Sequence, residues 1–518
     1  MPASSFGSTR PVGRHRDDEA WRSSYQTDYD RLLYAPEFRR LSGVTQVMSP
    51  QQNYVMHDRL THSLKVSQTA ERTAQFVIST YAKEHGQTYG ASARALKDQL
   101  IPAVCAVAGL AHDLGHPPFG HAAEQELQAL LGSGLSVLSV KGRPVLTDSF
   151  EGNAQSFRIV ARLSLRKHEL DAKREEKGLN LTWRSLGAIA KYPWLHGEHP
   201  PQFPKFADKW NFYNAEGAYL EHLRSTGVTH RYGDSALRQS LEAQVMDWAD
   251  DIAYAVHDLE DFYRTQRMPL NELRARPVHL AVDKDDDEIA EDPPSLPDVD
   301  EVWESLIELT FNRLRGELPN VYAGTSDPID RASLFSIAEN VRGLFPARPF
   351  DGSLDAHAVL QAFSSSLIRQ LQSGARLVEA KTGALLLEVA PVARLTAELL
   401  KSITHMYVIN TPGVAMMQRG QRRAIRELFT YLHEMAVATF VDGRGGAAGE
   451  RRLPAKLVEY GRLAMASTDL DDYRNDEARV ARAVLDYLCT LTDAQTSLLH
   501  QRLTGDAIAD QAPYWLNT

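Results

Sequence analysis

The sequence predicts an all-α fold with at most one short β-hairpin. Apolar residues recur at the three- and four-residue spacing of amphipathic helices along most of the 518 residues. Strand patterns are scarce, and no segment repeats with a fixed period. With 43% hydrophobic and 24% charged residues, the chain has the composition of a globular protein with a sizeable core. We therefore expect a helical core that is completed by further helices toward the C-terminus.

Helices are expected wherever periodic apolar segments lie between turn residues. In the first half of the chain they cover residues 60–81, 95–114, 121–131, 151–165 and 235–263. In the second half they cover residues 302–315, 334–344, 356–371, 392–406, 418–437 and 476–499. The single hairpin is expected where segments 135–140 and 144–146 flank Lys141 and Gly142.

Breaks in this pattern divide the chain into four parts. We expect an N-terminal arm (1–27), a helical core (28–265), an acidic linker (266–300) and a C-terminal helical region (301–518) that completes the core. Between residues 283 and 300, nine acidic residues stand against one lysine, a balance of −8 within a net charge of −10. Because this stretch also contains three prolines, it is interpreted as a solvated loop, with a regulatory surface as the alternative.

The composition also limits the cellular setting. No run approaches the roughly 18 consecutive apolar residues that a membrane-spanning helix needs, so no membrane association is expected. The N-terminal residues include basic side chains but no apolar stretch of a secretory signal. Cys105 and Cys489 are the two cysteines, and neither belongs to a CxxC pair, which excludes a cysteine-based zinc site. Two free thiols in apolar helices predict a reducing, cytoplasmic location.

Residues 109–126, GLAHDLGHPPFGHAAEQE, are the segment richest in groups that carry chemistry. An apolar helix delivers His112 and Asp113 side by side, and Gly115 with two prolines then ends it. Imidazole and carboxylate suit a divalent ion in mixed nitrogen and oxygen coordination. The His-Asp dipeptide is weak evidence alone, because it occurs three times in the chain. Only this copy lies between a buried-looking helix and a sharp turn.

A second helix combines an apolar face with a face of carboxylates. The apolar arc, at about 100° per residue, comprises Val245, Trp248, Ala249, Ile252, Val256, Leu259 and Tyr263. On the opposite face, Asp250, Tyr254 and Asp258 follow one another at four-residue spacing and so lie on one stripe. Such a face is often merely solvated. A tyrosine between acids, without a lysine in the segment, instead favours a polar pocket for a cation.

Two further histidines extend the pattern. His62 lies in an amphipathic helix 50 residues before His112, where it is either a ligand or an ordinary helix histidine. His121 and Glu124 are three residues apart at the start of a helix and are therefore neighbours. A carboxylate beside an imidazole orients the ring and favours its protonated form, as a general acid requires. A weak surface ion pair is the alternative.

Taken in order, these residues resemble a known family. His62, His112-Asp113 and Asp250 resemble the H…HD…D signature of the HD superfamily of metal-dependent phosphohydrolases. The segments RRLSGVTQV, DRLTHSLKV, AHDLGHPPFGHAAEQEL, FEGNAQSFRIV, LGAIAKYPW and DWADDIAYAVHDLED resemble, in the same order, successive segments of dGTP triphosphohydrolases. The resemblance covers residues 28–264 and is looser in the C-terminal half. It implies an HD-domain helical core.

The resemblance also implies a role for each matching residue. The metal ligands would be His62, His112, Asp113 and Asp250, holding a divalent ion such as Mg²⁺ or Mn²⁺, with Fe²⁺, Ni²⁺ or Zn²⁺ as alternatives. Periodicity alone does not separate Asp250 from Asp251. His121, supported by Glu124, would protonate the leaving oxygen. The substrate contacts would be Arg59 and Lys191 to phosphate, Gln46, Tyr254 and Asp258 around the deoxyribose, and Asn153 in the pocket wall.

The resemblance implies hydrolysis of deoxynucleoside triphosphates, dGTP favoured, to deoxynucleoside and inorganic triphosphate. An HD phosphodiesterase or nucleotidase acting on another nucleotide is the enzymatic alternative. A nucleotide sensor responsive to single-stranded DNA is the other, since Arg419, Arg422, Arg423 and Arg426 would form one basic stripe on a helix. The family further implies a homo-oligomer, often a hexamer, with nucleotide or DNA effectors. In this chain Ala494 and Gln495 replace an arginine and an aromatic residue of the family pattern, which puts a C-terminal contribution to the pocket in question.

Overall fold

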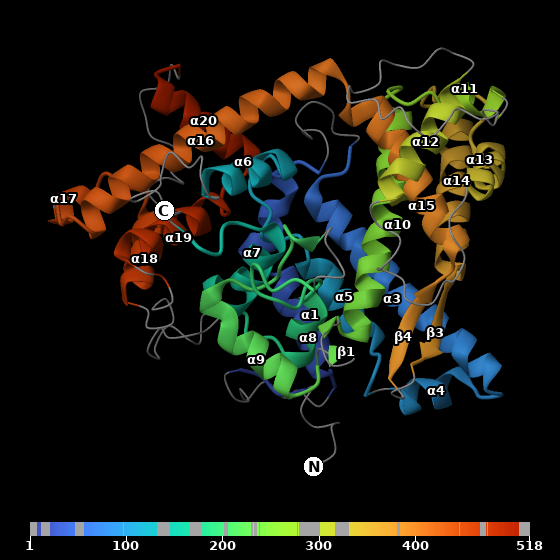
Figure 1. Ribbon diagram of the computed structural model, residues 1–518, viewed down its shortest axis with the longest axis horizontal. Helices are drawn as coiled ribbons and strands as arrows, with labels where there is room; N and C mark the ends of the chain where they lie inside the picture. The colour runs from blue at the N-terminus through green and yellow to red at the C-terminus, as the bar shows by residue number, and fades with distance from the viewer. Residues whose placement is uncertain are drawn as a thin grey trace.

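The computed structural model consists almost entirely of helices (Figure 1). The structure describes residues 8–11, 21–46, 56–96, 98–131, 146–164, 178–200, 206–228, 231–232, 236–237, 239–276, 278, 301–315, 331–380, 384–444, 446–466, 473 and 475–506. Within these ranges the strands form two antiparallel pairs and no larger sheet. The predicted all-α fold class is confirmed, although the described residues contain two short strand pairs where at most one hairpin was expected. No helix of the described residues is long and apolar enough to span a lipid bilayer.

The first half of the chain supplies the helices that surround the candidate site. They are α1 (Ser24–Leu33), α2 (Pro36–Arg40), α3 (Arg59–Glu84), α4 (Tyr89–Ala95), α5 (Pro102–Ala111), α6 (His121–Leu131), α7 (Gly152–Arg158), α8 (Trp183–Ile189), α9 (Gly217–Ser225) and α10 (Leu241–Arg264). The short strands β1 (Arg231–Tyr232) and β2 (Ala236–Leu237) pair just before α10.

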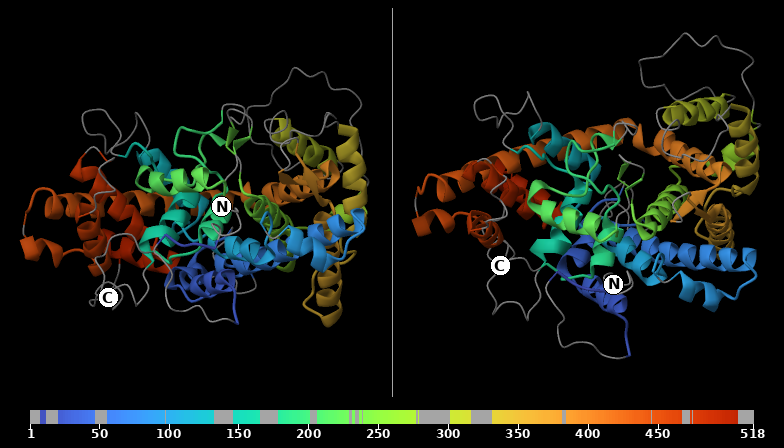
Figure 2. Two further views of the ribbon diagram at one scale, coloured as in Figure 1. Left: turned by 90° about the horizontal axis from the view of Figure 1, so that it is seen from below. Right: turned by 60° about the horizontal axis from the view of Figure 1, so that its bottom comes forward.

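The second half adds helices at both ends of this group. They are α11 (Leu270–Ala275), α12 (Val302–Arg315), α13 (Arg331–Leu344), α14 (Leu354–Ser373), α15 (Pro391–Thr404), α16 (Pro412–Phe440), α17 (Gly446–Glu450), α18 (Ala455–Ala466), α19 (Asp476–Leu488) and α20 (Asp493–Thr504). A hairpin of β3 (Ala375–Glu379) and β4 (Leu385–Val389) joins α14 to α15, with Ala375 opposite Val389. Figure 2 shows α11–α15 gathered at one end of the molecule and α16–α19 at the other.

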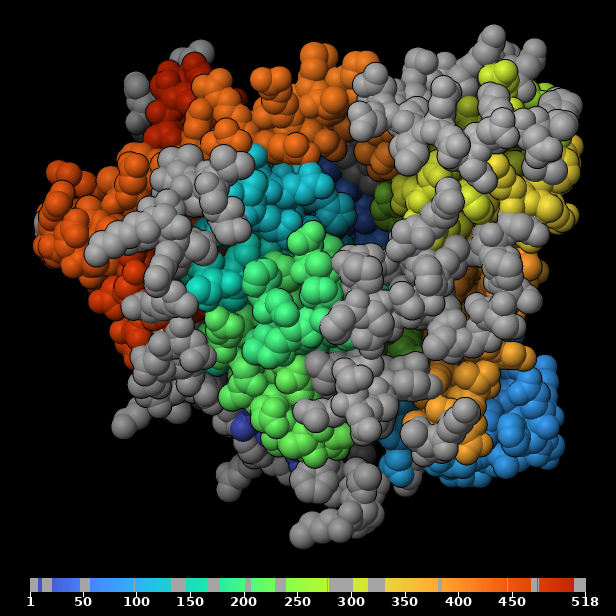
Figure 3. All heavy atoms as spheres, in the orientation of Figure 1, coloured from blue at the N-terminus to red at the C-terminus, as the bar shows by residue number. Residues whose placement is uncertain are grey.

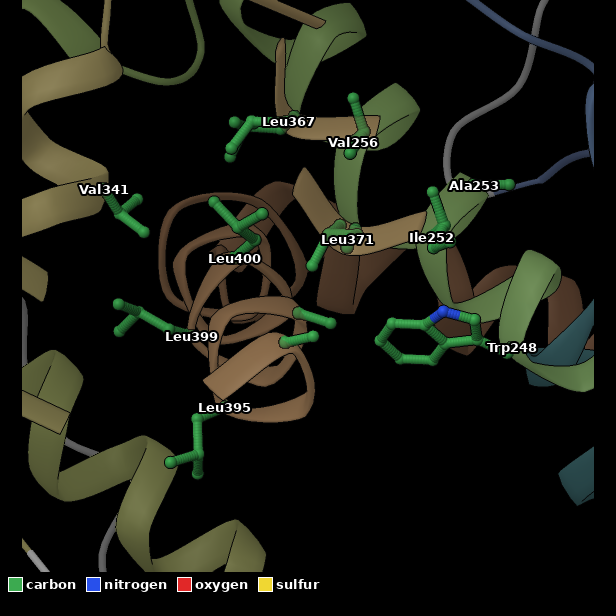
Figure 4. Packing of buried hydrophobic residues seen from close by; sticks show 14 of the residues in the cluster. Trp248, Ile252, Ala253, Val256, Val341, Leu367, Leu371, Leu395, Leu399 and Leu400 are labelled. Atoms are coloured by element: carbon green, nitrogen blue, oxygen red, sulfur yellow. The ribbon is translucent and has the colours of Figure 1, made fainter. Parts of the chain in front are cut away.

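Three large hydrophobic clusters and one small one hold the described helices together. The largest joins α3 and α10 to α12–α15, and Figure 4 shows Trp248 and Ile252 of α10 beside Leu371 of α14 and Leu400 of α15. A second cluster joins α6 to α16, α18 and α19. A third contains buried side chains of α1, α5, α8 and α9. The helices that bear the predicted ligands and the predicted acid are thus held by different cores.

The apolar arc predicted for α10 lies entirely within the largest cluster. Each of its seven side chains is buried, with Val245, Ala249 and Ile252 fully inaccessible to solvent. Burying such a face removes apolar surface from water at roughly 25 cal/mol per Å². It therefore fixes the rotation of α10 about its axis and turns the opposite stripe toward the candidate site.

Several helix boundaries differ from the predictions, each for a local reason. The helix expected at 95–114 begins only at Pro102, which occupies the first helical turn. The helix expected at 476–499 is two helices, because Thr492 and Gln495 form a capping box that begins α20. The helix expected at 235–263 begins after the N-cap Ser240. The predicted hairpin lies, apart from Leu146, outside the described residues, as does the acidic stretch.

Candidate active site

The predicted metal ligands come together where α3, α5 and α10 converge. His62 lies in the first turn of α3, and its Nε2 is 3.1 Å from Oδ1 of Asp250 on α10. His112 caps the end of α5, and its Nε2 is 3.6 Å from the same oxygen. Adjacent residues on a helix point about 100° apart, so His112 and Asp113 can face one centre only because the helix ends there.

Asp113 completes this group and connects it to a buried arginine. Its Oδ1 lies 3.5 Å from Nε2 of His112, and its Oδ2 accepts a 2.6 Å hydrogen bond from Arg59. Arg59 is 2% exposed and also donates to the backbone oxygen of Thr45. Gly120 has a positive φ of 60°, and a Cβ there would meet Nη2 of Arg59 at 2.9 Å. The turn that follows α5 is therefore shaped around the guanidinium.

The geometry suits a divalent cation. Ligand atoms of His62, His112 and Asp113 lie within 4.8 Å of one another, and all three residues are buried. Nδ1 of His112 hydrogen-bonds to the backbone oxygen of Gly109, which leaves Nε2 without a hydrogen-bond partner among the described residues. A buried polar atom without a partner is costly unless a ligand satisfies it. Two imidazoles and two carboxylates form a donor set for Mn²⁺, Fe²⁺ or similar ions.

The carboxylates of the predicted metal ligands favour a positive charge between them, as the pKa shifts of His112 and Asp250 show. Burial by itself lowers the pKa of His112, but the carboxylates of Asp113 and Asp250 outweigh burial and raise the pKa to about 9. Burial opposes ionisation of Asp250, yet Lys191 and His112 hold its pKa well below the usual range. The carboxylates are thus ionised, as ligation requires.

The two neighbouring aspartates of α10 point to different partners. Asp250 faces the two histidines, whereas Asp251 accepts a 2.6 Å hydrogen bond from Lys401 of α15. Lys191 contacts the outer side of Asp250, with Nζ 3.1 Å from Oδ2, and lies 2.7 Å from Asp247. The predicted phosphate-binding lysine is therefore placed beside a predicted metal ligand.

His121 and Glu124 form a hydrogen-bonded pair at the start of α6. Nδ1 of His121 lies 3.0 Å from Oε2 of Glu124, and the side-chain exposures are 64% and 4%. The other oxygen of Glu124 accepts from the backbone N–H of Gly152 and lies 3.3 Å from Nζ of Lys209. Burial raises the pKa of Glu124, but Lys209 and the bond from His121 hold it well below the usual range. An accessible imidazole thus rests on a buried, ionised carboxylate.

His116 lies between the pair of His121 and Glu124 and the predicted metal ligand Asp113. Its Nδ1 lies 3.0 Å from Oδ1 of Asp113, and its ring meets the ring of His121 edge-on at 5.3 Å between centroids. Ligand atoms of His116, His121 and Glu124 also lie within 4.8 Å of one another. His116 was not predicted as a functional residue, although it follows the His-Asp pair in the segment HDLGHPP, residues 112–118.

The predicted sugar-contacting residues follow Asp250 along α10. Tyr254 and Asp258 occur one and two turns later, and Nζ of Lys401 lies 5.9 Å from the centroid of the Tyr254 ring. Burial and the nearby carboxylate of Asp261 raise the pKa of Asp258 well above the usual range. One Asp258 oxygen has no hydrogen-bond partner among the described residues. Such a carboxyl is ready to bond a polar group of a ligand.

Gln46 and Asn153 lie at two other borders of the site. Gln46 follows Thr45, whose backbone oxygen holds Arg59, and its buried Oε1 lacks a hydrogen-bond partner among the described residues. Asn153 donates to Oε1 of Glu151, the oxygen that also lies 3.1 Å from Nζ of Lys209. Asn153 is thereby attached to the surroundings of the acid pair.

The C-terminal region contacts the site through Asp493, a residue that was not predicted from the sequence. Asp493, the first residue of α20, accepts hydrogen bonds from the backbone N–H groups of Thr45 and Phe119, at 2.9 and 2.8 Å, and from the Thr45 hydroxyl. Arg40 binds the backbone oxygens of Leu491 and His116. No local pattern signals these pairs, because their partners are far apart in sequence.

Three arginines of the predicted basic stripe on α16 bind other side chains of the protein. Arg422 donates to Gln125 of α6, and Arg426 forms a 2.6 Å ion pair with Glu126 of the same helix. Arg423 pairs with Glu427 one turn later. α16 therefore packs along α6, the helix that carries His121 and Glu124.

Figure 3 shows a hollow on one face of the molecule. Atoms of α6, coloured cyan, border it on one side and yellow atoms of the C-terminal helices border it on the other, with deep blue atoms of the N-terminal part at its floor.

Comparisons with known proteins agree with this geometry. Residues 59–255 match the HD domain family. The chain is 31% identical to the deoxyguanosinetriphosphate triphosphohydrolase-like protein of Streptomyces coelicolor, over 94% of each chain. It is 29% identical to the protein of the same name from Corynebacterium efficiens, over 93% of this chain and 92% of the relative. A similar protein of Pseudomonas aeruginosa is 32% identical over 53% of this chain and 59% of its own length. Because its relatives match it along nearly the whole chain, with the HD domain placed where the histidines and aspartates converge, this protein belongs to the dGTP triphosphohydrolase-like family of HD-domain metal-dependent phosphohydrolases.

Proposed function

We propose that the protein hydrolyses deoxynucleoside triphosphates, with dGTP favoured, to deoxynucleoside and inorganic triphosphate. One observation carries the proposal: an exposed imidazole backed by a buried carboxylate is joined, through His116, to the group of metal-ligating side chains. Cleavage of a phosphate ester needs both parts, because charge grows on the phosphate while the departing oxygen needs a proton.

The residues have the following proposed roles. His62, His112, Asp113 and Asp250 would hold a divalent cation, which would supply Lewis-acid polarisation of the α-phosphate. Arg59 and Lys191 offset negative charge on the phosphate oxygens, and both already lie against the carboxylates of the metal group. His121 delivers a proton to the 5′-oxygen of the leaving nucleoside. Glu124 orients the imidazole and favours its protonated form.

Discrimination against ribonucleotides is assigned to α10. The ring of Tyr254, beside Lys401, would pack against C2′ of the sugar and leave no space for a 2′-hydroxyl. Asp258 and Gln46, each with a buried oxygen that lacks a hydrogen-bond partner among the described residues, would bind the sugar hydroxyl. Asn153 would complete the pocket wall beside the acid pair.

The test is product analysis. The metal-free protein is incubated with each dNTP and each matching rNTP, with Mg²⁺, Mn²⁺, Fe²⁺, Ni²⁺ or Zn²⁺ in turn, and the nucleoside and phosphate products are separated. We expect deoxynucleoside and intact triphosphate, fastest with dGTP and with Mg²⁺ or Mn²⁺, and no products with chelator. Release of pyrophosphate or orthophosphate instead would favour an HD phosphodiesterase or nucleotidase. Binding without any turnover would favour the sensor.

The wider setting is proposed on the same footing. A cytoplasmic location fits the two buried free thiols, Cys105 and Cys489. Assembly into a homo-oligomer such as a hexamer, and regulation by nucleotides or single-stranded DNA, remain predictions from the family resemblance. Of the stripe proposed for an anionic effector, Arg422 and Arg426 bond to α6, so an effector there would act directly on the helix of the acid pair.

A further inference from the structure

We propose that His116, His121 and Glu124 form a second cation site, which binds Zn²⁺ and blocks turnover when it is filled. The blocking part rests on the proposed role of His121 as the acid, whereas the binding part does not. Two imidazoles and one carboxylate, with an open position for water, are a donor set that zinc accepts. Their ligand atoms already lie within 4.8 Å of one another.

Each of the two buried ligands has an outer partner that fixes its orientation. Nδ1 of His116 lies 3.0 Å from Oδ1 of Asp113, and a histidine ligand typically has such a carboxylate behind its second nitrogen. Glu124 has Oε1 occupied by the N–H of Gly152 and by Lys209, so that Oε2 is the oxygen directed at His121. The carboxylate therefore offers one oxygen to an ion, as a monodentate ligand does.

The third ligand is able to move. His121 is the first residue of α6, and its side chain is 64% exposed. Zinc–nitrogen bonds are about 2.0–2.1 Å long, so the three donor atoms must draw together slightly to share one ion. The exposed imidazole can make much of this adjustment by rotation, because solvent surrounds most of it.

Lys209 limits the affinity but does not abolish the site. Its ammonium lies 3.3 Å from Glu124 and repels a nearby cation. It also pairs with the fully buried Glu151 at 3.1 Å, so the charges of these three groups sum to −1. The second site is therefore expected to bind more weakly than the site of His62, His112, Asp113 and Asp250.

Filling the second site would remove the acid. A cation on Nδ1 of His121 displaces the bond to Glu124, and a cation on Nε2 occupies the nitrogen that faces solvent and substrate. Either way the imidazole can no longer carry the proton for the leaving oxygen. Saturating zinc should thus lower kcat by about a hundredfold or more, as for loss of a general acid.

The first experiment measures binding without substrate. Metal-free protein is titrated with Zn²⁺, and bound metal is counted by equilibrium dialysis. We expect two ions per chain in the wild type, one in His121→Gln, one in His62→Gln and none in the double variant. One ion in the wild type, or two in His121→Gln, would overturn the proposal. The variants are first compared with the wild type by circular dichroism and thermal midpoint.

A variant that gains a signal shows that the lost ion in His121→Gln is not caused by misfolding. In His121→Cys the new thiolate would give Co²⁺ an intense near-ultraviolet charge-transfer absorption, which nitrogen and oxygen ligands do not produce. The band should appear only after the first equivalent of Co²⁺ has bound. Cobalt binding without the band would contradict the site, and Cys105 and Cys489 do not interfere because both are buried.

The second experiment measures turnover by the Mn²⁺-loaded enzyme as Zn²⁺ is added. We expect kcat to fall at the zinc concentration that fills the second site, and to recover when a weak chelator removes that ion. Unchanged or increased turnover would refute inhibition. If the enzyme does not hydrolyse dNTPs at all, the proposed function fails while the binding experiment still decides the second site.

Discussion

At the scale of single residues, His121 and Glu124 form the proposed general acid and its supporting carboxylate, one exposed and the other buried. The imidazole reaches solvent, and the carboxylate that orients it is enclosed by Gly152 and Lys209. Sequence spacing alone predicted that the two residues are neighbours. The identity of the enclosing groups was not predictable, because Lys209 is 85 residues from Glu124 in the chain.

We predict that His121→Ala retains the metal but loses roughly two to four decades in kcat, the usual contribution of a general acid. The side chain is exposed and contributes little to packing, so the fold should be intact. Steady-state kinetics, metal content and thermal midpoint measured on the same preparation provide the check. Full activity in this variant would remove His121 from the mechanism.

Lys209→Met should shift the acidic limb of the activity profile toward higher pH. Burial raises the pKa of Glu124 and Lys209 is the strongest opposing influence, so its removal raises that pKa. A carboxyl with a depressed pKa stabilises the fold above its ordinary value of 4.5 and loses this contribution as pH falls. The variant should therefore also be less stable above that pH. The pH profiles of kcat/KM for the wild type, Lys209→Met and the control Lys209→Arg test this shift. Superimposable acidic limbs would show that Lys209 does not control the ionisation of Glu124 in the active enzyme.

At the scale of elements, the site depends on a close approach of α3 and α5. A Cβ at Gly109 would lie 2.6 Å from Cα of Ser67, which is closer than any real contact. The helices themselves were predictable from their apolar periodicity, and so was the buried face of α10. The close crossing of α3 and α5 was not predictable, because it depends on contact between Gly109 and the backbone of Ser67, which is distant in the sequence. The boundaries at Pro102 and Thr492 were missed because periodicity continues across them.

Gly109→Ala should separate α3 from α5, and with them His62 from His112. We expect a loss of about 1–3 kcal/mol in stability, as for an overpacked core, together with weaker metal binding. The matched control is Gly420→Ala on α16, where a Cβ meets nothing within 4 Å and helix propensity should add about 0.5–1 kcal/mol. Urea unfolding and metal titration test both variants. Equal effects from the two substitutions would show that the close approach is unimportant.

At the scale of the whole molecule, buried ion pairs attach the C-terminal helices to the core. Arg482 of α19 is completely buried, pairs with Asp148 at 2.8 Å and stacks 3.5 Å from the Tyr213 ring centroid. Arg158 of α7 likewise pairs with Asp486. The all-helical architecture followed from composition and periodicity. These long-range pairs did not, because no short motif marks two charges more than 300 residues apart.

Arg482→Met should destabilise the protein by about 3–5 kcal/mol, because it leaves Asp148 buried without its partner. The control Arg423→Met removes a solvent-exposed pair with Glu427 and should change stability little, because solvent screens that pair. Equilibrium unfolding in urea, followed by circular dichroism, measures the difference. A similar loss of unfolding free energy in both variants would show that burial does not make the Arg482–Asp148 pair more important for stability.

The hydrogen bonds of Asp493 have a consequence for the order of biosynthesis. During translation the ribosome makes Thr45, Arg59 and the four proposed metal ligands long before it makes residue 493. Until then, the backbone N–H groups of Thr45 and Phe119 lack the carboxylate that anchors them in the folded protein. Arg59, which Thr45 holds and which is proposed to bind phosphate, therefore gains its final support only at a late step of synthesis.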